Sequence, residues 1–76
     1  MKHLIEIIAR ALVDSPDDVS IKEVQGNSVL ILELSVAKMD VGKIIGKQGR
    51  NVDAIRTLLN AVSAKNNTRT LLEIVE

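Results

Sequence analysis

The stretch that decides the fold lies near the middle of the chain and reads Val41-Gly42-Lys43-Ile44-Ile45-Gly46-Lys47-Gln48-Gly49-Arg50-Asn51-Val52. Two glycines three positions apart, Gly46 and Gly49, separate two segments with helical spacing of apolar residues. Glycine has no Cβ, so the backbone of another molecule can approach such a turn closely. The first amides of the following helix carry partial positive charge. Because Lys47 and Arg50 flank the same turn, the stretch predicts contact with one or two phosphates rather than with a triphosphate.

Helices are expected on both sides of this turn. Asp40 is a plausible N-cap for a short helix that starts at Val41. A longer helix is expected from about Arg50 to about Lys65, before the polar residues 66–68. Residues 69–75 then alternate between two faces, which predicts a strand.

The residues before the turn predict one helix and two strands. Residues 2–13 carry an apolar stripe at helical spacing, formed by Leu4, Ile5, Ile8, Ala11 and Leu12. Pro16 ends this helix. Residues 19–25 and 28–36 alternate as strands, and a hairpin turn with positive φ at Gly26 or Asn27 is expected between them. The second strand is apolar on both faces and should be central, whereas the charged first strand should lie at an edge.

The predicted order is therefore α-β-β-α-α-β in a single domain over residues 1–76. The first two strands form an antiparallel hairpin, and the helical crossover should make the second and third strands parallel. We expect an α+β fold with a three-stranded mixed sheet and helices packed on one face.

Composition excludes several classes of protein. The 76 residues include no cysteine and one histidine, His3, so disulfides and sites with several thiolate or histidine ligands are excluded, and we expect no cofactor. The chain also has no aromatic residue, which excludes folds that stack bases on aromatic rings, such as the RRM, the cold-shock barrel and the OB-fold. A domain this short usually needs further support, and oligomerisation is the remaining source.

The net charge of zero conceals an uneven distribution. Residues 1–37 carry a net charge of −3, and residues 38–56 carry +3. An anion that binds should therefore bind the middle segment. Charge alone favours the simpler interpretation, a solvated face with ordinary salt bridges.

Other functions fit the sequence less well. A nucleotide phosphate loop needs four residues between its glycines and a Ser or Thr after the lysine, but Gln48 follows Lys47 here. A dinucleotide fingerprint fails on its spacing, and no group of residues supports catalysis. Gly46 and Gly49 could also simply interrupt a helix. The sequence has no apolar run long enough to cross a bilayer and no pattern typical of a signal peptide. We therefore expect a cytoplasmic protein that does not act at a membrane.

Residues 45–52 resemble the I-G-x-x-G-x-x-[IVL] signature of the KH domain. The predicted element order is that of the type II KH fold, and the chain is similar in length to the small bacterial single-domain KH proteins of the KhpA family. The resemblance implies binding of single-stranded RNA, with the turn against its backbone. The implied RNA-binding residues are Lys43, Ile45, Gly46, Lys47, Gln48, Gly49 and Arg50. The motif also implies that Ile45 and Val52 anchor the turn to the core.

The resemblance implies two functions that differ in class. The first is an RNA-binding protein, a post-transcriptional regulator or RNA chaperone that acts as a dimer. The second is a protein-interaction subunit that forms a heterodimer with a larger KH-domain protein of the KhpB/Jag type, with RNA binding secondary.

The helix after the turn carries two apolar stripes. Val52, Ile55, Leu59 and Val62 should face the sheet. Ala54, Leu58 and Ala61 form an adjoining stripe that predicts a two-fold symmetric homodimer. In the alternative arrangement, this second stripe packs against the first helix.

Overall fold

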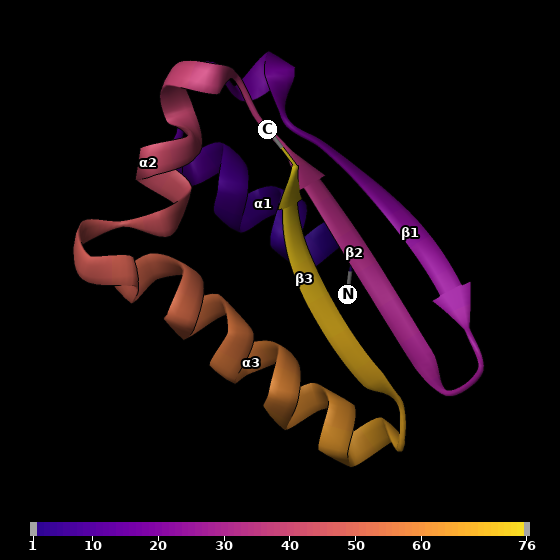
Figure 1. The fold of residues 1–76 in the computed structure, drawn as a ribbon. Helices are drawn as coiled ribbons and strands as arrows, with labels where there is room; N and C mark the ends of the chain where they lie inside the picture. The colour runs from indigo at the N-terminus through magenta and orange to yellow at the C-terminus, as the bar shows by residue number, and fades with distance from the viewer. Residues whose placement is uncertain (1, 76) are drawn as a thin grey trace.

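The computed structural model describes residues 2–75, and its elements follow the predicted α-β-β-α-α-β order (Figure 1). The helices and strands are α1 (Lys2–Leu12), β1 (Ser20–Gly26), β2 (Val29–Ser35), α2 (Val41–Ile45), α3 (Arg50–Asn66) and β3 (Arg69–Val75). Short 3₁₀ segments η1, η2 and η3 span Pro16–Asp18, Lys38–Asp40 and Lys47–Gly49. The last of these forms the turn between α2 and α3.

Strand β2 lies in the centre of a three-stranded sheet, between β1 and β3. β1 and β2 are antiparallel, with Ile21 opposite Leu34, and β2 and β3 are parallel, with Leu32 beside Leu72. Parallel neighbours need a crossover connection, and α2 and α3 supply it. The predicted mixed sheet with a central second strand is confirmed.

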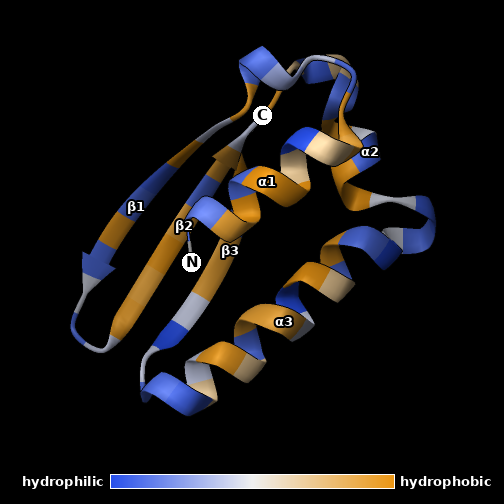
Figure 2. Cartoon of the chain, turned by 180° about the vertical axis from the view of Figure 1, so that it is seen from behind, coloured by the Kyte–Doolittle hydropathy of each residue, from blue (hydrophilic) through white to orange (hydrophobic). Residues whose placement is uncertain are grey.

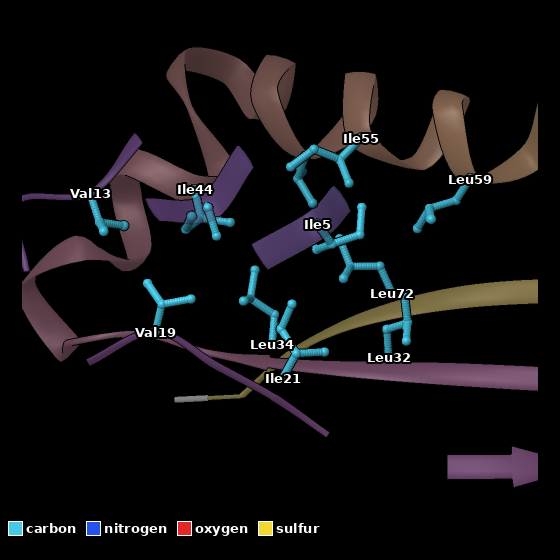
Figure 3. Close-up of a cluster of buried hydrophobic side chains, with 12 residues drawn as sticks. Ile5, Val13, Val19, Ile21, Leu32, Leu34, Ile44, Ile55, Leu59 and Leu72 are labelled. Carbon is cyan, nitrogen blue, oxygen red and sulfur yellow. The ribbon is translucent and has the colours of Figure 1, made fainter. Parts of the chain in front are cut away.

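The core lies between the helices and one face of this sheet. Leu32 and Leu34 of β2 are fully buried together with Ile5 of α1 and Ile44 of α2. Figure 3 shows these side chains pointing into the same space as Leu59 of α3. Burying one side chain of this size stabilises a fold by roughly 1.5–3 kcal/mol. Figure 2 is seen from the helical side, with α1 in front of the sheet and α3 beside β3, which confirms that the helices pack on one face.

The buried side of α1 differs from the predicted stripe. Ile5 and Ala9, which are four residues apart, are fully buried, whereas Leu4 is 42% exposed and Ala11 is also exposed. Residues at this spacing lie one above the other on a helix, so Ile5 and Ala9 form the centre of the buried side. Ile8 and Leu12 of the predicted stripe are half-buried and pack against the same core. Ile7, at 53% exposure, lies on the outer side of α1. The helix therefore presents apolar side chains to solvent as well as to the sheet.

The hairpin between β1 and β2 turns at Asn27 and Ser28. Positive φ occurs at Ser28, with a value of 60°, so the prediction of Gly26 or Asn27 is wrong. Gly26 instead remains in β1 and pairs with Val29. The carbonyl of Ser28 accepts a hydrogen bond of 3.1 Å from the amide of Arg69. This long-range contact ties the hairpin to the start of β3, and local sequence does not reveal it.

Helix α3 carries the two predicted apolar stripes. Val52, Ile55 and Leu59 are buried, and Val62 is half-buried, as predicted for the side that faces the sheet. The second stripe is exposed, and it consists of Ala54, Leu58 and Ala61. Leu58 is 48% exposed, so the alternative in which this stripe is covered by α1 is wrong.

Candidate nucleic-acid interface

The turn between α2 and α3 contains three residues with positive φ. Gly46 has φ 79° and ψ 172°, a conformation essentially restricted to glycine. Gln48 (φ 58°, ψ 26°) and Gly49 (φ 75°, ψ 13°) are both left-handed. These conformations reverse the chain within a few residues, and α3 begins immediately afterwards at Arg50.

Gly46 lies directly against Asn51 in the first turn of α3. A Cβ at position 46 would lie 2.6 Å from Cγ and 2.8 Å from Cβ of Asn51. The side-chain amide of Asn51 donates a hydrogen bond of 2.9 Å to the carbonyl of Lys43. The last carbonyls of a helix lack partners within that helix, so Asn51 caps the end of α2 from α3. This contact holds both helices against the turn.

Two backbone amides of the turn have no acceptor among the described residues. The amide of Gly49 donates to the carbonyl of Gly46 at 3.1 Å, and the amide of Arg50 donates to the carbonyl of Lys47. The amides of Lys47 and Gln48 donate to no acceptor within residues 2–75. Successive amides in a turn can form a concave site for an anion, and the N-terminus of α3 adds partial positive charge. This arrangement of backbone amides can hold an anion such as a phosphate.

The predicted cationic side chains at the turn are exposed. Lys47 and Arg50 have no carboxylate partner within the described part of the chain. Arg50 Nη2 donates a hydrogen bond of 3.3 Å to Oε1 of Gln48, so these two side chains lie together at the N-terminus of α3. The structure brings Lys47, Gln48 and Arg50 together around Gly46 and Gly49.

Lys43 is placed differently from the other predicted residues. Its ammonium pairs with Asp14 at 2.7 Å and with Asp40 at 3.5 Å. The hydrogen bond to Asp14 is the main reason that the pKa of Lys43 lies above its ordinary value, and Asp40 adds to this effect. Two carboxylates thus already balance the charge of Lys43, which joins α2 to the loop after α1.

Asp40 is a fully buried carboxylate beside the site. Asp40 is the N-cap residue of α2, as predicted, but its side chain makes no capping bond to that helix. The side chain instead accepts a hydrogen bond of 3.0 Å from the amide of Ser15. Burial alone would raise the pKa of the Asp40 carboxyl. Hydrogen bonds from the amides of Ser15 and Asp14 and the nearby ammonium of Lys43 outweigh that effect, and the pKa lies below its ordinary value.

The apolar residues of the motif take different positions. Val52 is buried, as predicted, but Ile45 is 37% exposed, so it does not anchor the turn as expected. Its neighbour Ile44 is fully buried and fills that role. Helical geometry turns consecutive side chains about 100° apart, and here Ile44 rather than Ile45 faces the core. Ile45 leaves an aliphatic surface next to the turn.

A shallow groove separates α3 from the outer strand β3. Its volume is about 420 Å³, and its lining consists of Arg56, Asn60, Arg69, Thr70, Leu71, Leu72 and Glu73. Sequence reasoning did not identify these residues as functional. The available signal was the polar side of the helix after the turn, where Arg56 and Asn60 lie, but their position against β3 depends on the packed fold.

Residues 2–75 hold neither a membrane-spanning helix nor a metal-binding cluster. No helix in this range is long and apolar enough to cross a membrane. Within the same range, no group of three or more histidine or carboxylate side chains is arranged to hold a metal ion.

Comparisons of sequence identify one family, and a solved structure shares the fold. The family model described as "KhpA/KhpB, KH domain" matches residues 2–74. "RNA-binding protein KhpA" of Chlamydia pneumoniae is 58% identical over 76 residues, which cover 100% of this chain and 97% of the relative. The protein with the same name from Clostridium acetobutylicum is 53% identical over 75 residues, which cover 99% of this chain and 100% of the relative. A crystal structure of Aquifex aeolicus Era shares the fold, with a TM-score of 0.61 and 19% identity over 96% of this chain and 28% of that chain.

The glycines of α2 and of the turn provide a matched pair for testing the geometry. Gly46→Ala should lower the free energy of unfolding by about 2 kcal/mol or more, because it adds a Cβ against Asn51 at a backbone conformation reserved for glycine. Gly42→Ala is the control, since no atom lies within 4 Å of its added Cβ. Gly42→Ala should leave stability unchanged or raise it slightly, because alanine favours helix. Chemical denaturation of both variants tests this difference, and equal stabilities would contradict the packing of Gly46 on Asn51.

The buried carboxylate predicts a pH-dependent effect. Because the pKa of folded Asp40 lies below its ordinary value of 3.8, ionised Asp40 stabilises the fold above about that pH, and this contribution is lost as the pH falls through the folded-state pKa. Asp40→Asn should therefore lower the thermal midpoint at pH 7 by roughly 5 °C or more, and the difference from the unaltered protein should narrow below pH 3.8. Asp17→Asn, in the exposed turn after α1, is the control and should leave the midpoint unchanged. A difference that is constant with pH would show that charge at Asp40 is unimportant.

Proposed function

The chain belongs to the KhpA/KhpB KH-domain family, and we propose that it binds single-stranded RNA with the backbone of the RNA against the turn between α2 and α3. The observation that carries this proposal is the pair of amides at Lys47 and Gln48, which have no acceptor among the described residues. They lie at the N-terminus of a helix, next to two cationic side chains without carboxylate partners in the described residues. The name "RNA-binding protein" carried by relatives 53–58% identical to this chain supports the same function.

Each residue of the turn has a distinct role in this proposal. Gly46 and Gly49 let the RNA backbone approach, the amides of Lys47 and Gln48 donate to a phosphate, and the side chains of Lys47 and Arg50 balance its charge. Exposed Ile45 offers an aliphatic surface to a base, which suits a chain without aromatic residues. Lys43 has a supporting role, because Asp14 and Asp40 already hold its ammonium.

The groove between α3 and β3 extends this site. It contains Arg56 and Arg69 together with one carboxylate, Glu73. A strand whose phosphate rests on the turn can pass along α3 and place its next bases in the groove. We propose that the protein acts by binding RNA in the cytoplasm, as a post-transcriptional regulator or RNA chaperone rather than as an enzyme.

Replacing the two variable residues of the turn tests RNA binding. Lys47→Asp combined with Gln48→Asp should abolish binding to a single-stranded RNA while the circular dichroism spectrum stays unchanged, because both side chains are exposed. The unaltered protein should show a shallow dependence of log affinity on log salt concentration, with a slope of roughly −1.4 to −2.1 for two to three phosphate contacts.

The control for this experiment carries the same change in charge on the outer strand β1. Lys22→Asp combined with Ser20→Asp should keep the affinity within about twofold, because both residues lie on β1, which β2 separates from β3 and the groove. Equal loss in both double variants would indicate a nonspecific charge effect. Unchanged affinity in the turn variant would refute the proposed function.

We also propose that the protein works as a homodimer through the exposed stripe of α3. Ala54, Leu58 and Ala61 form this stripe, and the two alanines let a second helix approach closely around Leu58. On α1, Leu4 and Ile7 are also exposed, at 42% and 53%. Pairing supplies a second RNA site at high effective concentration, which a weak single site needs.

The same exposed stripe supports the second candidate function. An apolar helix face can pair with a larger KH-domain protein as readily as with a second copy of this chain. In that case the chain acts chiefly as an interaction subunit, and RNA binding is secondary.

Leu58→Asp tests the dimer. It should give a folded monomer in sedimentation velocity, with weaker RNA binding, because a charge replaces the largest exposed side chain of the stripe. Met39→Asp is the control, since Met39 is 79% exposed but lies outside α3, and it should remain dimeric. A folded Leu58→Asp variant that is still a dimer would rule out this interface, and an unaltered protein that is monomeric would favour the partner-subunit function.

A further inference from the structure

Arg56 stands across the groove between α3 and β3. Its Nη2 atom donates a hydrogen bond of 3.4 Å to the backbone carbonyl of Leu72. β3 is an outer strand of the sheet, so this carbonyl belongs to an edge without a neighbouring strand. The bond is long compared with the usual 2.9–3.0 Å and therefore weak. No carboxylate within residues 2–75 pairs with this guanidinium, so an incoming acceptor can displace it from Leu72 at little cost.

Arg56 also lies on the strip of α3 that leads from the turn into the groove. At about 100° per residue, Gly49, Asp53, Arg56 and Asn60 fall within a narrow arc of the helix. Arg56 follows Gly49 by about 10 Å along the helix axis at 1.5 Å per residue. An RNA strand held at the turn therefore brings a nearby base to Arg56.

The backbone of β3 offers few free groups near this point. The amide of Thr70 donates to Oγ of Ser63 at 2.9 Å, and the carbonyl of Leu72 accepts from Arg56. Glu73, the one carboxylate in the lining, follows the buried Leu72, so its side chain lies on the opposite face of the sheet from α3. A base that enters the groove beside Leu72 therefore meets the donors of the Arg56 guanidinium.

From this geometry, and resting on the RNA-binding function proposed above, we infer that Arg56 determines which base the groove accepts. A guanidinium presents a planar fork of donors and no acceptor. It matches a base edge with two adjacent acceptors, such as O6 and N7 of guanine. O2 and N3 of cytosine present the same pair. Adenine has an amino donor next to its ring acceptor, and uracil has its N3–H donor between two acceptors. Each of these bases therefore places a donor opposite the donors of Arg56, which is unfavourable.

Direct binding measurements on the full chain test this assignment. The probes are oligouridine strands that carry G, C, A or U at one internal position, and each strand can slide until that base reaches its preferred place. The unaltered protein should bind the strand with G or C roughly tenfold more tightly than the strand with A. Arg56→Ala should reduce that ratio to below about twofold while the plain strand still binds through the turn.

Two further variants separate the fork from its charge. Arg56→Lys keeps the charge but lacks the planar fork, so it should not restore the preference. Arg10→Ala is the matched control, because Arg10 pairs with Glu6 on α1, and it should keep the preference. Circular dichroism verifies that each variant is folded.

The outcomes distinguish this inference from the function on which it rests. A preference for guanine alone identifies O6 and N7 as the selected acceptors. A preference for cytosine alone identifies O2 and N3. Either preference supports the assignment. Equal binding of all four strands, or a preference that survives Arg56→Ala, overturns the assignment while RNA binding at the turn stands. Failure of the unaltered protein to bind any strand overturns the proposed function and this assignment together.

Discussion

The contact of the Gly46 backbone with Asn51 is the constraint on which the candidate site depends. Asn51 fills the space that a Cβ at position 46 would need, and its amide caps α2 at the Lys43 carbonyl. That single side chain fixes where α2 ends and where α3 starts. On either side of it, Ile44 and Val52 enter the core. The turn is thus held by the same packing that stabilises the fold, and the amides of Lys47 and Gln48 stay in place without a bound partner.

Much of the fold could be predicted because its signals are local and strong. Alternation in residues 28–36 identified the central strand, and the spacing of Val52, Ile55 and Leu59 identified the core side of α3. The predictions that were wrong or held only in part concern residues whose conformation depends on distant contacts. Ser28 takes positive φ next to Arg69, and the side chain of Asp40 bonds to the amide of Ser15 rather than to its own helix. Such pairings, between residues far apart in sequence, leave no periodic pattern.

The candidate site was predicted unevenly for the same reason. The resemblance to KH domains, together with the glycine spacing, identified the turn, and the structure shows how its backbone is arranged. The groove depends on how α3 lies against β3, and one sequence gives no measure of that distance. The charge pattern of the sequence was a poor guide at Lys43. This residue belongs to the basic segment in sequence, but in the fold its ammonium pairs with Asp14 and Asp40. The cations left without such partners near the turn, Lys47 and Arg50, concentrate the field of a neutral protein at one place.

Three sides of helix α3 each have a different structural or proposed functional use, and this limits how its sequence can change over evolutionary time. One side is buried with Ile55, another lines the groove with Arg56, and a third exposes Leu58. A substitution almost anywhere along this helix therefore alters folding, the groove or the exposed stripe. By contrast, strand β1 is exposed at every position but Ile21, and β2 separates it from β3 and the groove. Neutral drift should collect on that strand, while α3 changes slowly.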